Sequence, residues 1–397
     1  MKFWLVRLLS IGAALAFAFG IQAWAVSSLN DYDARLVVLA FLYITLAVSL
    51  NIINGITGQF SIGHAAFYMI GAYSAGFITN THFANSGLPP VLWLIAMAVV
   101  GAFCAAIAGL IVGLPSLRLR GDYLAIVTLG FGEIVRIVVQ NQEAVGGPYG
   151  LKIRPQFNFL WVIVMLAIIT IAVSRNLLKT AQGLSFLAVR EDEVASSAMG
   201  VNVTQVKVIA FLLGSGFAGA AGACYALFDT FITPTTFSMA ESFMILTMVV
   251  LGGSGSITGS ALAAVTLFVL PELLRKAPDV TGAQVTAGVL AAFLLVAAIR
   301  WISTSFHGAM PRRLALYGGA LGGTVALQFA LAAAFSMIPA IAERSYKAAD
   351  LRWPIFAITL VGVMLIRPQG VFAHHEFSWN WLFGLFRRFR RKEAAPV

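Results

Sequence analysis

Two ionisable side chains stand inside a stretch that is otherwise apolar. Glu133 and Arg136 lie three positions apart within residues 122–140, a run long enough to cross a bilayer. On a helix this spacing puts both side chains on one face, where each charge partly neutralises the other. Charged groups at membrane depth face the interior of a helix bundle or a cavity. The pair predicts either a structural ion pair that fixes helix register, which is the preferred interpretation, or a gate along a transport path.

The residue types that carry out catalysis are not arranged for it. No Ser/His/Asp or Cys/His arrangement and no paired carboxylates stand out in the sequence. His64 has no clustered His, Cys or carboxylate partner, so we expect a buried histidine that hydrogen-bonds nearby backbone, and no metal site. The chain also lacks the GxxxxGK[ST] phosphate loop, so it cannot hydrolyse ATP by that route. We predict a protein that is not an enzyme, has no catalytic residue and binds no metal or cofactor of its own.

The composition indicates a membrane protein. Hydrophobic residues make up 60% of the 397 residues, charged residues 11%, and the mean hydropathy is +0.89. A soluble domain carries about 25% charged residues, so the deficit means that most of the surface faces lipid. The formal charge is +10, and the basic residues behind it cluster in loops, where they set the orientation of a membrane protein. The charge therefore does not indicate nucleic-acid binding. We predict an all-α, polytopic integral membrane protein with about ten to twelve transmembrane helices.

Twelve apolar runs are candidates for membrane spans. They are 3–25, 35–55, 60–80, 91–113, 122–140, 157–174, 206–228, 241–253, 258–275, 284–302, 314–340 and 353–366. If all of them cross, both termini lie on one side of the membrane. Seventeen of the 26 Lys and Arg residues then fall on that side and eight on the other, which predicts cytoplasmic termini.

The first run has a second interpretation. Its basic start, apolar middle and Ala-Trp-Ala at 23–25 also fit a cleavable signal peptide. The apolar stretch is long for a signal sequence, so a retained first helix is the preferred prediction. Cleavage would change the number of spans but not the orientation of those that follow.

One long polar segment, residues 176–211, interrupts the apolar pattern. Within it the letters REDEVASSAMG predict a short helix with Glu191, Asp192 and Glu193 in its first turn, where carboxylates suit the positive end of the helix dipole. Gly200 would end this helix as a left-handed C-cap. A capped helix exposed beside a membrane is typical of a docking element; the alternative is a surface loop that merely joins two spans.

Two glycine-rich stretches interrupt the spans, at residues 54–63 and 251–260. In a bilayer, a backbone that leaves the helical conformation is stable only where other protein buries it or where it lines a water-filled cavity. Helices interrupted in this way often form substrate sites in transporters. Small-residue packing between helices is the alternative. The two stretches share a loose pattern, a weak sign of an internal repeat: Gly58, Ser61, Ile62 and Gly63 in the first, and Gly253, Ser256, Ile257 and Gly259 in the second.

The polar segment resembles the coupling loop of bacterial ATP-binding-cassette importers, in which an acidic residue and an alanine precede a glycine. Here those residues are Glu193, Ala195 and Gly200. Two further stretches, LNIINGITGQFSIGHAAFYMIGAYSAG at 50–76 and LRLRGDYLAIVTLGFGEIVRIV at 117–138, look like the LivM-type permease of branched-chain amino-acid uptake systems. Several motifs occur in the same order as in that family, so together they are more specific than any single motif.

The resemblance covers residues 50–275 and resumes at 351–372, LRWPIFAITLVGVMLIRPQGVF. The residues between these two parts depart from the family pattern. The organisation that follows is a transmembrane permease domain over 1–372, a cytoplasmic coupling loop at 176–205, a family-atypical insert with extra helices at 276–350, and a basic cytoplasmic tail at 373–397.

By this resemblance the chain would be the permease subunit of an ATP-dependent importer in the bacterial inner membrane, moving branched-chain or related amino acids. Its partners would be a homologous second permease, two cytoplasmic ATPase subunits that bind ATP and Mg, a periplasmic substrate-binding protein and membrane lipid. Urea, short amides or aromatic acids are rival substrates. A stand-alone secondary transporter or channel is the alternative class, but it would need more intramembrane ionisable groups than Glu133 and Arg136.

The motifs and the resemblance together nominate two groups of residues. Helix 191–199 would be the lever that follows closure of the ATPases. The residues expected to couple to the ATPases are Arg190, Glu191, Asp192, Glu193, Ala195 and Gly200. The residues expected along the translocation path or its gate are Gly58, Ser61, Gly63, His64, Glu133, Arg136, Gly253 and Ser256.

Overall fold

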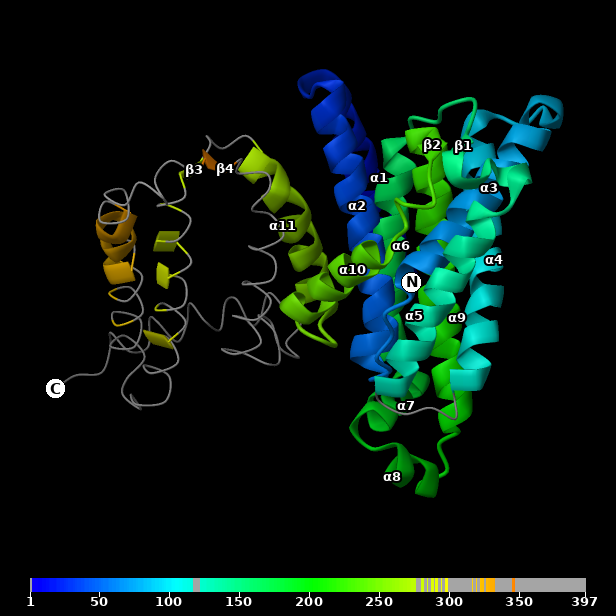
Figure 1. Ribbon diagram of the computed structural model, residues 1–397. Helices are drawn as coiled ribbons and strands as arrows, with labels where there is room; N and C mark the ends of the chain where they lie inside the picture. The colour runs from blue at the N-terminus through cyan, green and yellow to red at the C-terminus, as the bar shows by residue number, and fades with distance from the viewer. Residues whose placement is uncertain are drawn as a thin grey trace. The chain divides into compact units, whose positions relative to one another are not determined.

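Long helices account for most of the chain in a computed structural model. The residues that it describes are 2–116, 122–275, 280–281, 345–346 and scattered helical positions between 284 and 332. They form two compact units, one built on Met1–Val265 and the other on Thr266–Val371. The first unit is a helix bundle, which confirms the all-α prediction (Figure 1).

The elements of the first unit follow one another in an almost entirely helical order. The helices are α1 (Lys2–Ser28), α2 (Asp31–Asn51), the π-helical turn η1 (Ile52–Ile56), α3 (His64–Ser86), α4 (Pro90–Ser116), α5 (Asp122–Gln140), the 3₁₀ turns η2 (Glu143–Val145) and η3 (Gly147–Tyr149), α6 (Leu160–Leu178), α7 (Ala181–Glu191), α8 (Glu193–Ala198), α9 (Val203–Asp229), α10 (Met239–Gly252) and α11 (Ile257–Arg275), which runs on into the second unit. Two short strands, β1 (Leu151–Lys152) and β2 (Phe231–Ile232), pair antiparallel.

Local sequence signals mark several helix ends. Gly87 ends α3 in the left-handed conformation, with φ 60°, and Pro90 opens α4 in the first turn, where its missing N–H costs nothing. The side chain of Thr180 accepts a hydrogen bond of 3.1 Å from the backbone N–H of Gly183 at the start of α7. These caps explain why the chain turns where it does between long apolar runs.

Six of the described helices are long and apolar enough to cross a membrane. The candidate spans are Ile11–Ser28, Asp31–Ile56, Pro90–Leu114, Tyr123–Gln140, Leu160–Leu178 and Val203–Asp229. Helix α3 has 23 residues and packs in the same bundle, although its polar content keeps it out of this set. The predicted total of ten to twelve spans remains a prediction, because the last predicted run, 353–366, lies outside the described residues.

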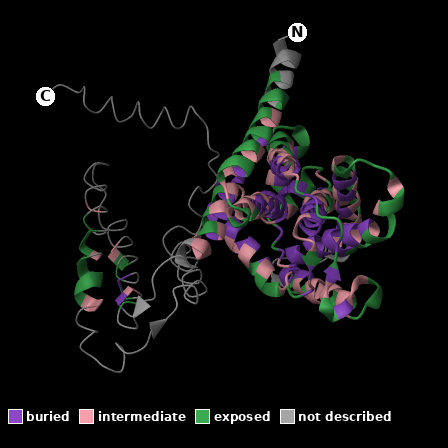
Figure 2. Cartoon of the chain, turned by 90° about the horizontal axis from the view of Figure 1, so that it is seen from above, coloured by how far each residue is buried: buried purple, intermediate pink, exposed green. Residues whose placement is uncertain are grey.

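Small residues bring α3, α4 and α9 into close contact at the centre of the bundle. A Cβ atom on Gly71 would lie 2.0 Å from the carbonyl oxygen of Gly219, and one on Gly219 would lie 2.3 Å from that of Gly101. Such approach is possible only for glycine and is the usual way that helices associate without a hydrophobic driving force. The buried residues gather in this part of the bundle, whereas α1 projects with an exposed surface (Figure 2).

Different elements lie at the two ends of the bundle. At one end β1 and β2 join the loops that follow α5 and α9, and Arg35 of α2 pairs with Asp229 of α9 at 2.8 Å. The short helices α7 and α8 lie at the opposite end (Figure 1). Arg35 and Gly55 stand at opposite ends of the helix formed by α2 and η1. A loop that contacts Arg35 therefore lies at one end of the bundle, and a loop that contacts Gly55 lies at the other.

The second unit contains its own small pairing. Strand β3 (Val280–Thr281) runs antiparallel to β4 (Ser345–Tyr346), with Val280 opposite Tyr346. This pairing joins the start and the end of the segment that the sequence assigns to an insert, 276–350. The bounds of that insert stay a prediction.

Candidate functional site

Both glycine-rich stretches are breaks between helices. In the first, Gly58 follows η1 with a φ of +71°, and α3 begins at His64. In the second, Gly253 caps α10 with a φ of +114°, and α11 begins at Ile257. Positive φ is strained for any residue with a Cβ atom, which explains the glycine at each break. The shared sequence pattern therefore corresponds to a shared role in the backbone, the end of one helix and the start of the next.

The two breaks meet inside the bundle. The side-chain oxygen Oδ1 of Asn51 accepts a hydrogen bond of 2.9 Å from the backbone N–H of Gly255. A Cβ atom on Gly55 would lie 2.2 Å from that same nitrogen, so the backbones of the two segments are in direct contact. Asn51 is fully buried and would be costly there without such a partner. The first break cannot move without changing the surroundings of the second.

Only some polar groups of the first break find hydrogen-bond partners nearby. The Asn54 side chain donates to the carbonyl of Ser61 at 3.1 Å and accepts from its N–H at 3.2 Å. The hydroxyl of Ser61 itself is buried without a hydrogen-bond partner among the described residues. Gly63 packs so closely against α5 that a Cβ atom would lie 2.1 Å from the carbonyl oxygen of Thr128. In the second break, the hydroxyl of Ser256 accepts from the N–H of Gly259 at 3.1 Å.

His64 is buried at the start of α3, as predicted. Its Nε2 lies 2.9 Å from the hydroxyl of Ser49 in α2, which also donates to the carbonyl of Leu46. The neighbouring N–H of Ala65 donates to the hydroxyl of Ser242 in α10 at 3.1 Å. Hydrogen bonds at one turn of α3 therefore connect α2 and α10.

The predicted helix over residues 191–199 is divided in the structure. Helix α7 ends at Glu191, and Asp192 is the N-cap of α8 rather than a residue of its first turn. Its Oδ1 accepts from the N–H groups of Val194 and Ala195, at 2.8 and 3.0 Å. A short acidic side chain that bonds its own backbone competes with helix continuation, which explains the break. Gly200 adopts the predicted left-handed conformation, with φ +87°.

Arg190 connects this segment to the first helix break. Its Nη1 donates to the carbonyl oxygen of Gly55 at 3.2 Å, and its Nη2 lies 2.7 Å from the Glu191 carboxylate. A Cβ atom on Gly58 would lie 2.9 Å from Cγ of Arg190, so the arginine stem packs on that glycine. Beneath it, Phe186 of α7 belongs to a buried apolar cluster with residues of η1 and α9.

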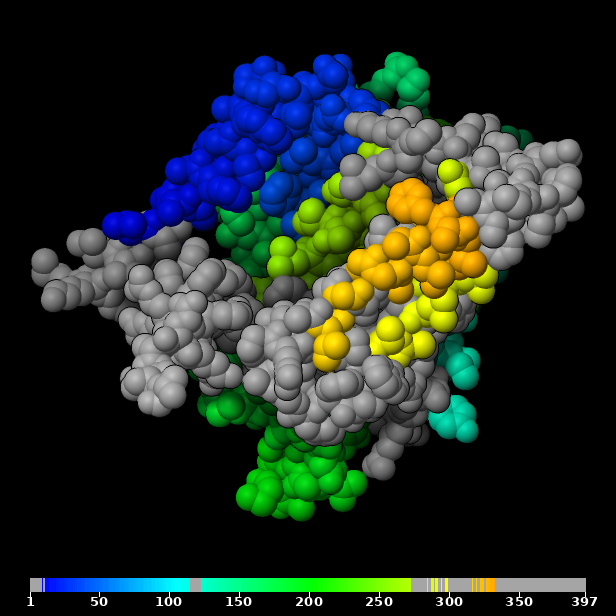
Figure 3. Space-filling view, turned by 90° about the vertical axis from the view of Figure 1, so that its left-hand side faces the viewer, coloured from blue at the N-terminus to red at the C-terminus, as the bar shows by residue number. Residues whose placement is uncertain are grey.

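A second contact ties α8 to α9. Glu193 forms an ion pair with Lys207, whose side chain is only 6% exposed. The segment from α7 to α8 is therefore held by two charged contacts and an apolar cluster, while most of α8 remains exposed to solvent. Its green atoms project from the lower end of the molecule in Figure 3.

Glu133 and Arg136 form the ion pair that their spacing predicts. Nη2 of Arg136 lies 2.6 Å from the Glu133 carboxylate, and both side chains are about one third exposed in this chain, at 26% and 35%. Gly132, the residue before Glu133, lies beside the first break: a Cβ atom on it would lie 3.8 Å from Cα of Gly63. The described part of the structure thus places the predicted path residues around one region, with this pair at its edge.

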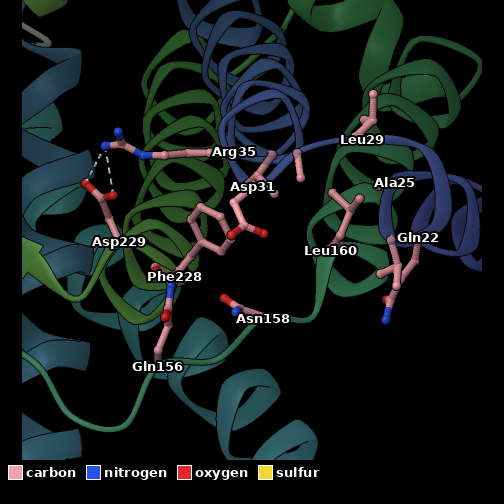
Figure 4. A pocket seen from close by; sticks show the side chains of 13 residues that line it. Gln22, Ala25, Leu29, Asp31, Arg35, Gln156, Asn158, Leu160, Phe228 and Asp229 are labelled. Carbon is pink, nitrogen blue, oxygen red and sulfur yellow. Dashed lines mark hydrogen bonds and ion pairs between the residues drawn. The ribbon is translucent and has the colours of Figure 1, made fainter.

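A cavity of about 480 Å³ opens at the end of the bundle opposite α7 and α8. The turn between α1 and α2 and the ends of α6 and α9 form its walls, and the ion pair between Arg35 and Asp229 stands beside it (Figure 4). Tyr225 donates a hydrogen bond of 3.0 Å to Asp229 from the inner side. Polar groups thus continue from this cavity into the bundle.

Comparison with known proteins identifies the family. Residues 34–299 match the family described as the permease component of branched-chain amino acid transport systems. The chain belongs to this permease family. Its fold and membrane character agree with that assignment, and the matched region contains both helix breaks and the segment from α7 to α8. The match also extends into the first apolar run of the segment assigned to an insert.

Two kinds of permease are similar to the chain. The high-affinity branched-chain amino acid transport system permease protein LivM of Escherichia coli K12 is 37% identical over 272 residues, which cover 60% of this chain and 62% of that protein. A probable LivM permease of Methanocaldococcus jannaschii is 27% identical over 271 residues, covering 59% and 78%. LivH of E. coli K12 is 26% identical over 260 residues, covering 60% and 83%. The chain therefore spans less than two thirds of the length of E. coli LivM. No solved structure matches it.

Several residues that organise this permease were not singled out from its sequence. Asn51 ends an apolar run directly before the first glycines, and that position is a usable signal. Thr128 and Ser242 are single hydroxyl residues in apolar runs and carry no signal of their contacts. Glu241 is a lone carboxylate at the start of the apolar run 241–253. By the same reasoning that selected Glu133, its charge at membrane depth marks it as a candidate.

Proposed function

We propose that this permease is a subunit of an ATP-dependent importer for branched-chain or related amino acids. Membership in the permease family supports this function, and the contact between Arg190 and Gly55 is the observation that carries the mechanism. Gly55 in turn touches the backbone of Gly255, which also donates a hydrogen bond to Asn51. A displacement of α7 would therefore be passed to both helix breaks through direct contacts. A transporter that uses ATP at a distance needs such a mechanical connection.

The proposed assembly contains a homologous second permease, two cytoplasmic ATPase subunits that bind ATP and Mg, and a periplasmic substrate-binding protein. Closure of the ATPases around nucleotide would move α7 and α8, and the helices would change from inward to outward access. Nucleotide can shift this equilibrium only if the ATPases bind the two states of the permease with different affinities. The binding protein would select the substrate.

The exposed apolar residues of the segment from α7 to α8 support its role in docking. Leu184, Val194 and Met199 are 64%, 64% and 84% exposed, although the segment around them is polar. Apolar side chains of a short helix, surrounded by polar residues, suit insertion into a groove of a partner protein. We propose that these three side chains, together with Arg190, Glu191, Asp192, Glu193, Ala195 and Gly200, form the interface and coupling element for the ATPase.

The distribution of basic residues supports an orientation in which α7 and α8 face the cytoplasm. Arg175, Lys179 and Arg190 lie at this end of the bundle, and the predicted cytoplasmic termini would share that side. The end that carries β1 and β2 would face the periplasm of a bacterial inner membrane and receive the binding protein. The exposed apolar faces of α4 and α5 would contact lipid or the second permease.

ATP-driven uptake in a reconstituted system tests the proposal. The permease would be purified with its partner subunits and placed in liposomes with the binding protein and radiolabelled leucine. We expect uptake that requires ATP, the binding protein and ATPase subunits able to hydrolyse ATP. Leucine uptake driven by an ion gradient without the ATPases would instead indicate a stand-alone transporter. Uptake of urea, amides or aromatic acids in place of leucine would contradict the proposed substrate class.

A further inference from the structure

A half-buried glutamate with one buried carboxylate oxygen lies at the start of α10, beside the contacts that join the helices. Glu241 stands in the first turn of α10, and the hydroxyl of Tyr43 in α2 donates a hydrogen bond to it. Its other oxygen, Oε1, is buried and has no hydrogen-bond partner among the described residues. No salt bridge in the described part of the chain reaches this carboxylate. One acceptor in the interior of the bundle is thus available.

Three aromatic rings near Glu241 pack against one another. The ring centroid of Tyr68 lies 5.5 Å from that of Tyr225 and 4.9 Å from that of Phe237, and Tyr225 lies 6.0 Å from Phe237. Tyr68 and Tyr225 both lie within electrostatic range of Glu241. The rings come from α3, α9 and the turn before α10, so four segments of the bundle meet around one carboxylate.

Arg35 is engaged elsewhere. Arg35 pairs with Asp229 at 2.8 Å, and Asp229 also accepts the hydroxyl of Tyr225 at 3.0 Å. The positive charge of Arg35 neutralises the negative charge of Asp229, whereas no cation in the described part of the chain neutralises Glu241. A buried carboxylate is unfavourable unless a cation or further donors complete it. Tyrosine rings attract cations over their faces, so a carboxylate with tyrosines nearby is chemically suited to an ammonium group.

We propose that Glu241, together with Tyr43, Tyr68 and Tyr225, binds the ammonium group of the transported amino acid. The carboxylate oxygen Oε1 would accept from the ammonium, and the tyrosine rings would exclude water around it. This inference rests on the proposed function and specifies where the substrate is held within the permease. It gives a role to a carboxylate whose buried oxygen has no partner among the described residues.

The location of this site connects it to the helix breaks. The residue after Glu241, Ser242, accepts a hydrogen bond from Ala65, one position after His64 and two positions after Gly63 of the first break. The other end of the same helix, α10, is the second break at Gly253. Any rearrangement of the breaks therefore displaces Glu241, so the affinity of the site for an ammonium group would differ between the two access states.

The test measures substrate held by the whole importer. The complex is trapped with ATP and vanadate in the presence of binding protein and radiolabelled leucine, and the label retained per complex is counted after rapid gel filtration. The wild-type complex should retain label. Glu241→Gln should reduce retention about tenfold or more, because it removes the charge that bonds the ammonium. Glu241→Asp should retain more label than Glu241→Gln, since it keeps the charge.

Tyr73→Phe is a matched control. Its ring lies 6.1 Å from Phe237 in the same aromatic group, but its hydroxyl points to the carbonyl of Ile232 and not to Glu241. We expect Tyr73→Phe to retain label like the wild type, while Tyr43→Phe retains several-fold less. If Glu241→Gln fails to assemble, the difference between these two tyrosine variants decides the question.

The outcomes separate this site from the proposed function. Retention by Glu241→Gln within twofold of the wild type, or equal retention by the two tyrosine variants, would overturn the site while leaving amino-acid import intact. A wild-type complex that imports leucine but retains none in the trapped state would overturn it too. A wild-type complex that neither imports nor retains any amino acid would overturn the proposed function itself.

Discussion

Replacement of Arg190 by methionine should separate ATP hydrolysis from transport. Met keeps an unbranched apolar stem that can pack on Gly58, but it loses the guanidinium that donates to the carbonyl of Gly55 at 3.2 Å. The neighbouring substitution Glu191→Gln is compared with it: Glu191 belongs to the proposed ATPase interface, so weaker docking would lower ATP hydrolysis and uptake together and leave their ratio unchanged. This substitution removes the partner of Arg190 in the 2.7 Å ion pair and leaves the contact to Gly55 in place.

The expected magnitudes of these two changes differ. A hydrogen bond from a charged donor to a partly buried carbonyl contributes about 1.5–3 kcal/mol. The Arg190 side chain is only 20% exposed, so its contact to Gly55 is not fully screened by water. Glu191 is 73% exposed, and an exposed ion pair contributes about 0–1 kcal/mol. Because 1.4 kcal/mol corresponds to a factor of about ten, Arg190→Met should shift the attachment of α7 to η1 by about 10- to 100-fold.

The measurement compares leucine taken up with ATP hydrolysed by the same proteoliposomes. Arg190→Met should hydrolyse ATP at a rate near that of the wild type and transport at least about tenfold less leucine per ATP. Glu191→Gln should change this ratio by less than about threefold. The reasoning would be refuted if both variants kept the wild-type ratio, or if Glu191→Gln lowered it as much as Arg190→Met. A loss of the assembled complex in Arg190→Met alone would indicate a structural role for the contact.

Three further predictions concern the rest of the site. Gly200→Val should destabilise the end of α8 by about 1–2 kcal/mol through backbone strain alone, because a Cβ atom there meets nothing within 4 Å. Uptake should fall in cells that still insert the permease, and Gly200→Asn should lower it less. Cysteine probes at Ser197 and Gly147 should react with membrane-impermeant reagents from opposite sides, Ser197 from the cytoplasm, and reaction of both from the periplasm would overturn the orientation. Glu133→Gln and Arg136→Gln should each lower protein level, and the double variant should recover part of it; a coupling energy near zero instead of about 1 kcal/mol would reject the pairing. Normal protein levels in all three variants with transport alone lost would assign the pair to the path or its gate.

The features that the sequence predicted correctly depend on near neighbours. The C-cap at Gly200, the breaks at Gly58 and Gly253, and the ion pair of Glu133 with Arg136 are all set by residues within a few positions of one another. Backbone strain and helical spacing act over that range, so a single sequence contains the required information. The wrong boundary of the helix at 191–199 is also local: the Asp192 side chain bonds to the backbone ahead of it and forms a cap.

Contacts between distant segments could not be predicted in this way. Asn51 and Gly255 are 204 positions apart, and Arg190 and Gly55 are 135 positions apart. Which glycine faces which asparagine depends on how the helices pack, and the pattern of each stretch alone is compatible with ordinary small-residue packing. Small-residue packing is present as well, both between Gly71, Gly101 and Gly219 in α3, α4 and α9 and at the two breaks, where Gly63 and Gly259 make equally close contacts.

The length of α10 explains how the breaks and the carboxylate can act together. With 14 residues the helix is about 21 Å long, which is shorter than the bilayer core of about 30 Å. A helix of this length cannot have one end at each membrane surface, so at least one end lies among the other helices. Its first turn carries Glu241 and its last residue precedes Gly253, and between them the helix is a rigid rod. A change of backbone angle at Gly253 therefore has to appear as a displacement of Glu241 relative to Tyr43 of α2. The chain of contacts from Arg190 to Gly55, then Gly255, and on through α10 leads from the proposed ATPase surface to the proposed substrate site without requiring any long-range deformation of the bundle.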